Sequence, residues 1–67
     1  MLLRKVMNLQ PGTCVLLGVK GAPERYWHIS QVTTVTLKDV TLVISNSDEN
    51  TETVTLNADD LVEVLLT

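Results

Sequence analysis

Few side chains in this 67-residue chain could carry acid–base or nucleophilic chemistry. His28 is the only histidine and Cys14 the only cysteine. A nucleophile pair needs a thiol or hydroxyl beside a base, and an acid that orients the base. Cys14 and His28 could meet if the segments that carry them pair, but the sequence shows no third member. We therefore expect no catalytic site, with His28 a structural surface residue and Cys14 a small buried one.

Metal and phosphate sites are equally unsupported. One histidine and one cysteine cannot fill a four-ligand zinc shell. Asp48, Glu49 and Glu52 lie close together in the sequence, yet this segment lacks the ligand spacing and the glycine of a calcium loop. The chain also has no glycine-rich phosphate loop. The sequence therefore predicts no metal and no cofactor, and it indicates that the acidic segment is a solvated turn.

Two segments could form contact surfaces for a protein partner. The first joins a Gly/Pro loop to an Arg and two large aromatic residues, the residue types that dominate binding hot spots. Its members are Lys20, Glu24, Arg25, Tyr26 and Trp27. The second is acidic and comprises Asp48, Glu49, Glu52, Asp59, Asp60 and Glu63. In the alternative interpretation of the first segment, Trp27 fills the core and Tyr26 caps it, because a chain without Phe needs one large core residue.

The net charge of −3 is distributed unevenly along the chain. Residues 1–38 contain all five cations and one acid, whereas residues 39–67 contain seven acids and no cation. Opposite charges on neighbouring strands could pair, or the two halves could form a bipolar surface that docks a charged partner. Because an acidic chain repels phosphate, we expect no nucleic-acid binding.

Residues branched at Cβ predict an all-β domain. Twenty-one residues are Val, Ile or Thr, whose stiff side chains fit a pleated sheet. Five strands are expected near residues 13–19, 26–37, 40–45, 51–56 and 61–66. The inward-facing parity changes within the second strand, so we expect a bulge near residues 30–33. One 3₁₀ turn is expected at residues 57–60, before the last strand.

The expected core is built mainly from the inward positions of these strands. It comprises Val15 or Leu16, Trp27, Ile29, Leu42, Ile44, Val54, Leu56, Leu61 and Val64. Apolar residues on both sides of segments 15–17 and 61–66, together with Leu2, Leu3 and Val43, exceed what one small domain can hide. A chain of this length also has a small core, which oligomerisation can supplement. We therefore expect a homo-oligomer.

The pattern resembles the SH3-like small β-barrels in three places. Residues 11–15 (PGTCV) look like their opening turn and strand, residues 27–35 like their long bent second strand, and residues 57–64 (NADDLVEV) like the helical turn before the closing strand. The resemblance implies a single five-stranded barrel over residues 1–67, with residues 1–9 as a segment that could add a strand or an arm. An Sm-like ring subunit is a related possibility, although residues 1–9 are short for the N-terminal helix of that family.

The SH3-like resemblance implies no single function, because this architecture serves many kinds of ligand. A groove for Pro-rich peptides would need more aromatic residues than Tyr26 and Trp27. We expect a non-enzymatic protein-interaction module or accessory subunit with an unidentified protein partner. The alternatives are a small symmetric enzyme with its site at a subunit interface, using Tyr26, Gln31 and Lys38, and an acidic inhibitor that blocks a nucleic-acid-binding partner. No segment is long and apolar enough to span a membrane, and a lone cysteine favours the cytoplasm.

Overall fold

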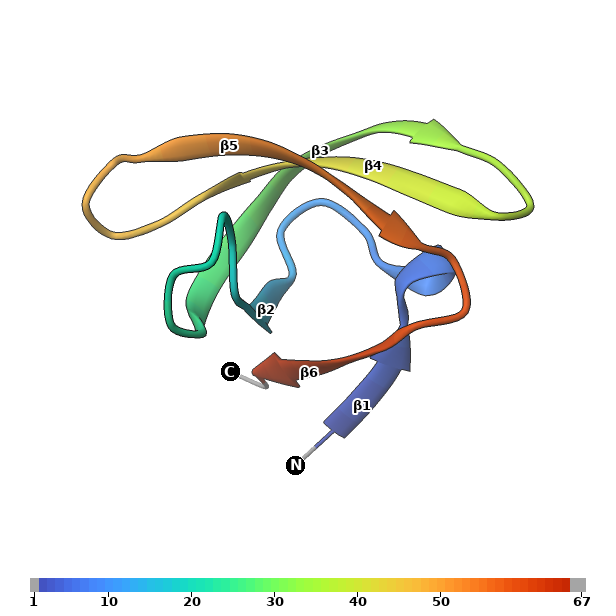
Figure 1. The fold of residues 1–67 in the computed structure, drawn as a ribbon, viewed down its shortest axis with the longest axis horizontal. Coiled ribbons are helices and arrows are strands. Elements are labelled where there is room, and N and C mark those ends of the chain that lie inside the picture. The colour runs from blue at the N-terminus through green and yellow to red at the C-terminus, as the bar shows by residue number, and fades with distance from the viewer. Residues whose placement is uncertain (1, 66–67) are drawn as a thin grey trace.

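The computed structural model describes residues 2–65, whose strands form one antiparallel sheet (Figure 1). The strands are β1 (Leu2–Lys5), β2 (Cys14–Leu17), β3 (Arg25–Val35), β4 (Asp39–Ser45), β5 (Thr51–Asn57) and β6 (Leu61–Leu65). A short 3₁₀ helix, η1 (Val6–Asn8), follows β1. The expectation of a small all-β domain is confirmed. Within residues 2–65 there is no helix with the length and apolar character needed to cross a bilayer.

The sheet order is β1-β6-β2-β3-β4-β5, so that the last strand lies between the first two. β2 to β5 follow one another as neighbours, and β6 returns to pair with both β1 and β2. Figure 1 shows the sheet folded over on itself, with β3 running from the lower strands to the upper ones. The two sides of the fold enclose the core.

The bend of β3 comes from two irregularities in its pairing with β4. The register shifts between Ile29 and Gln31, and again between Val32 and Thr34. An extra residue on one strand bends that strand and increases its twist. The bulge expected near residues 30–33 is therefore confirmed.

The expected five-stranded closed barrel is not formed. Residues 2–5 add a sixth strand beside β6, and β1 and β5, at the two ends of the sheet, do not pair with each other. The chain after β1 bonds to the β5–β6 turn: the Val6 N–H donates to the Asp60 carbonyl at 2.9 Å, and the Met7 N–H to the Ala58 carbonyl at 3.1 Å. These bonds attach η1 to that turn instead of bringing β1 alongside β5, so the sheet stays open.

The prediction of a 3₁₀ turn at residues 57–60 is also wrong. Asn57 continues β5, where it pairs with Asp39. The chain then reverses in a tight turn closed by a 3.1 Å bond from the Asp60 N–H to the Asn57 carbonyl. The Asn57 side chain accepts the Asp59 N–H at 3.0 Å. Because an Asn side chain can complete a turn in this way, no helical segment is needed.

The core consists of aliphatic side chains around one tryptophan. Its buried members are Val6, Leu9, Val15, Leu17, Val19, Trp27, Ile29, Val40, Leu42, Ile44, Ala58, Val62 and Val64. Val54 and Leu56, which were expected in the core, are only partly buried, and Val15 rather than Leu16 is the buried residue of that pair. The prediction of Leu61 as a core residue is wrong. Alternation along β6 turns Val62 and Val64 inward and therefore Leu61 outward.

Candidate protein-contact face

Four neighbouring strands turn alternate side chains away from the core. Because Leu2 packs on the core and pairs with Val64, the next pair, Leu3 and Glu63, points outward. The same alternation applies to β6, β2 and the first half of β3. We call this side of β1, β6, β2 and β3 the outer face; it carries Leu3, Lys5, Cys14, Leu16, Tyr26, His28, Leu61, Glu63 and Leu65.

The outer face is rich in exposed apolar side chains. The exposed fractions are 60% for Leu61, 51% for Leu3, 43% for Leu65 and 42% for Tyr26. Within the described chain, these are four of the seven large hydrophobic residues that are exposed. Single exposed apolar residues are ordinary on a protein surface, but a contiguous group of them marks a site of interaction.

A carboxylate lies among these apolar side chains. Glu63 is half-buried, lies opposite Leu3 on β1, and stands two positions from both Leu61 and Leu65 on its own strand. The Tyr26 hydroxyl reaches across β2 and donates to Glu63 Oε2 at 3.1 Å. This hydrogen bond, followed by desolvation and the charge of Glu63, raises the pKa of Tyr26 above its ordinary 10.0. The outer face is thus an apolar surface with an acceptor held among its side chains.

Cys14 and His28, the two candidates for chemistry, come together at one end of the outer face. They are direct cross-strand partners, beside an open hollow of about 300 Å³ lined by Arg4, Gly12, Thr13, Cys14, His28, Val64 and Leu65. Burial raises the pKa of the Cys14 thiol above its ordinary 9.0, so the thiol stays protonated and is a poor nucleophile at neutral pH. None of the described residues that line the hollow is a carboxylate that could orient the imidazole.

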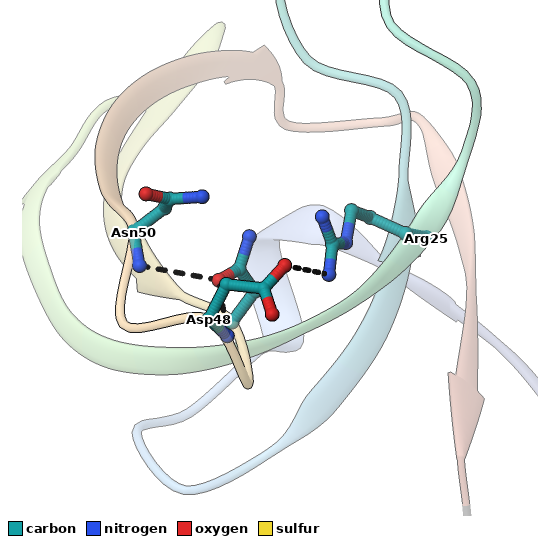
Figure 2. Close-up of polar contacts among 4 residues, drawn as sticks. Arg25, Asp48 and Asn50 are labelled. Atoms are coloured by element: carbon teal, nitrogen blue, oxygen red, sulfur yellow. Dashed lines mark hydrogen bonds and ion pairs between the residues drawn. The ribbon is translucent and has the colours of Figure 1, made fainter.

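The two segments expected to contact a partner pair with each other. Arg25 and Asp48 point toward one another (Figure 2), with Nη2 and Oδ2 3.0 Å apart. Two further pairs join Lys20 to Glu52 at 2.9 Å and Lys5 to Asp59 at 4.0 Å. Every ion pair among residues 2–65 therefore joins a cation of the first half to an acid of the second, but each has a member in a loop or turn. The expected pairing of opposite charges between neighbouring strands is not seen among these residues.

The Arg25–Asp48 pair covers the core at Trp27. Asp48 is fixed by the β4–β5 turn, in which Asn46 Oδ1 accepts the N–H groups of Asp48 and Asn50 at 2.9 and 3.2 Å (Figure 2). The Arg25 guanidinium also lies 5.9 Å from the centre of the Trp27 ring, which is a cation–π distance. Trp27 itself is only 5% exposed, so it fills the core and is not displayed to a partner.

The remaining members of the two expected segments are scattered. Glu24, Glu49 and Asp60 are exposed in loops and turns, whereas Tyr26 and Glu63 meet on the outer face. Sequence reasoning placed Leu3, Leu16, Leu61 and Leu65 in apolar segments expected to support a homo-oligomer, but it did not group them on one face. The signal that pointed to them was the excess of apolar residues on both sides of segments 15–17 and 61–66, although it did not show which side is exposed.

Comparison of the chain with family models, curated proteins and solved structures finds no match. Within residues 2–65, no three His, Cys, Asp or Glu side chains gather closely enough to hold a metal ion. The outer face is therefore the candidate site, interpreted from its own geometry.

Proposed function

We propose that this chain is a non-enzymatic protein-interaction module, an accessory subunit that binds another polypeptide through the outer face. The observation that carries the proposal is the group of exposed apolar side chains there, Leu3, Tyr26, Leu61 and Leu65. Apolar surface left in water costs about 25 cal/mol per Å². A partner that covers the outer face removes that cost, and this supplies the driving force for binding.

The outer face supports this role better than the loop or the acidic segment. Trp27 is buried, and Lys20 and Arg25 are engaged in ion pairs within the chain. A partner that used these cations would first have to separate them from their carboxylates. Tyr26 and Glu63 are the members of the two segments that lie on the outer face.

We also propose that the sheet is an open variant of the SH3-like architecture. The support is the succession β2 to β5, the long bent β3, and the return of β6 to pair with β2. In this interpretation, β1 and η1 are additions to the five strands of the family. The buried free thiol of Cys14 suits a reducing compartment, so the proposed setting is the cytoplasm.

The alternative functions have less support. An enzyme built on Tyr26, Gln31 and Lys38 would have to combine them from different subunits, because Tyr26 lies near the start of β3 and Lys38 lies beyond its other end. An inhibitor that mimics nucleic acid would display a row of free carboxylates. Asp48, Glu52 and Asp59 instead neutralise cations of the same chain.

A photo-crosslinking residue on the outer face tests the proposed function in the source cell. With p-benzoylphenylalanine in place of Leu61, we expect one discrete crosslinked species. Leu37 is the matched control, because it is 93% exposed in the β3–β4 turn and lies away from the outer face. A folded protein that yields no species specific to position 61 would contradict the proposal.

A further inference from the structure

We infer that the partner of the outer face is a second copy of this chain, packed face to face about a twofold axis. This inference rests on the proposed function and names its partner. In a twofold interface the same patch contacts itself, so the patch must be complementary to its own image. Apolar side chains satisfy this condition, because they can pack against identical side chains. The charged residues of the outer face satisfy it only if each one meets an opposite charge on the second copy.

The outer face carries one lysine and one carboxylate in positions suited to twofold pairing. Lys5 lies opposite Leu61, and Glu63 lies opposite Leu3. Lys5 and Glu63 are therefore diagonal neighbours on the two strands, about 7–8 Å apart and somewhat closer at their Cβ atoms. A twofold axis that passes between them places Lys5 of each copy against Glu63 of the other. Another protein would need both charges at matching positions, whereas a second copy has them by symmetry.

Both charged groups are available for this contact. Lys5 is exposed and lies 4.0 Å from the exposed Asp59, whereas the other two ion pairs of the described chain are 2.9 and 3.0 Å long. The Lys5–Asp59 pair therefore contributes little and is more readily exchanged than the other two. The Tyr26 hydroxyl donates to Oε2 of Glu63, so Oε1 is left to accept a hydrogen bond from an ammonium group. The Tyr26 bond also holds the carboxylate in place, which reduces the entropy lost when the partner lysine binds.

The size of the outer face sets the strength of the dimer. The whole outer face, four strands about 4.8 Å apart by the five residues of β6 at about 3.4 Å each, measures about 19 by 17 Å. An axis between Lys5 on β1 and Glu63 on β6 makes the two copies overlap mainly over these two strands. Standard stable interfaces bury about 800 Å² on each partner, roughly a fifth of the 4462 Å² surface of this chain. The outer face is less than half of that, so we expect a weak dimer that dissociates at high micromolar concentration.

Sedimentation equilibrium of the purified protein, from about 1 µM to about 1 mM, tests the dimer with a charge exchange. Lys5→Glu places two acids against each other, and Glu63→Lys places two bases. Each variant alone should dimerise at least about tenfold more weakly than wild type, because like charges meet at the interface. An equimolar mixture of the two should recover dimers, because every altered residue then meets an opposite charge. Only contacts between copies can produce that recovery.

Further variants separate the interface from general effects of charge and folding. Lys38→Glu makes the same charge change as Lys5→Glu, but in the β3–β4 turn, and should dimerise like wild type. Leu61→Glu changes an exposed residue and should weaken dimerisation about tenfold or more. Circular dichroism of each variant verifies that it is folded.

Three results would overturn the inference: a wild type that is monomeric at about 1 mM, a mixture that stays monomeric, or a Lys38→Glu variant as weak as Lys5→Glu. If the purified protein is monomeric while position 61 still crosslinks a different protein in the cell, the twofold dimer is wrong and the proposed function stands. If position 61 crosslinks nothing, the proposed function fails as well.

Discussion

Protonation of Tyr26 is linked to folding through its bond to Glu63. Ionisation of the phenol removes the hydrogen bond and places a phenolate beside a carboxylate, which is why the pKa of Tyr26 is raised above 10.0 in the folded chain. The folded state therefore favours the protonated phenol. This contribution to stability is complete below the unfolded-state value near 10.0 and is lost as the pH rises through the higher folded-state pKa.

The chain contains a single tyrosine, so the rise in absorbance that accompanies ionisation of a phenol reports Tyr26 alone. An alkaline titration of the folded protein should have a midpoint above 10.0. In Glu63→Gln the hydrogen-bond acceptor remains but the charge is removed, so the midpoint should move toward that of the unfolded chain. The protein unfolded in urea supplies that reference value. Equal midpoints for the folded and unfolded wild type would show that the bond is not formed.

Among the elements, η1 fixes the N-terminal segment to the core. Val6 is fully buried, whereas its neighbour Met7 is exposed. Val6→Ala removes two methyl groups, each worth about 0.8 kcal/mol, and leaves a cavity, so the free energy of unfolding should fall by about 2 kcal/mol. Met7→Ala, in the same helix, should change it by less than about 0.5 kcal/mol. Urea denaturation compares the two variants, and equal small losses would mean that η1 does not pack on the core.

The strands and their buried faces were predictable wherever the apolar side chains of a segment fall on only one of its two faces. Val40, Leu42 and Ile44 share a parity with polar or smaller neighbours between them, and the observed β4 (Asp39–Ser45) agrees with the predicted range 40–45. The run at 61–66 is apolar on both parities, so Leu61 could equally have faced the core. The pairing of Val64 with both Leu2 and Val15 decides this, and such pairing depends on the whole sheet.

The outer face was not predictable as a site, because its members come from four strands whose spatial order is not written in the sequence. Leu3 joins Leu61 and Leu65 only because β1 pairs with β6. The meeting of Tyr26 with Glu63 depends in addition on the placement of β6 beside β2. The uneven distribution of charge did indicate pairing between the halves, but the individual partners, such as Arg25 and Asp48, follow from how the turns lie in space.

For the molecule as a whole, the layout of charge argues against binding to nucleic acid. The net charge is −3, and three of the five cations lie in ion pairs with carboxylates of the same chain. Because affinity for phosphate comes from uncompensated cations, we expect no gel shift with duplex DNA at physiological salt. The triple variant Asp48→Asn/Glu52→Gln/Asp59→Asn frees those cations and should show weak binding at low salt. Tight wild-type binding with a steep salt dependence would contradict this prediction.

The place of β6 in the sheet sets the time at which the chain can fold on the ribosome. β6 is the last of the described strands to be synthesised, yet it lies between β1 and β2. Until Leu65 has left the exit tunnel, β1 has no strand to pair with and one edge of β2 stays open. Joining Leu2 to Val64 also closes nearly the whole described chain into a loop, an entropic cost that is offset only when the sheet is completed. The nascent chain therefore emerges with open strand edges accessible to chaperones, and its native sheet forms only when β6 inserts.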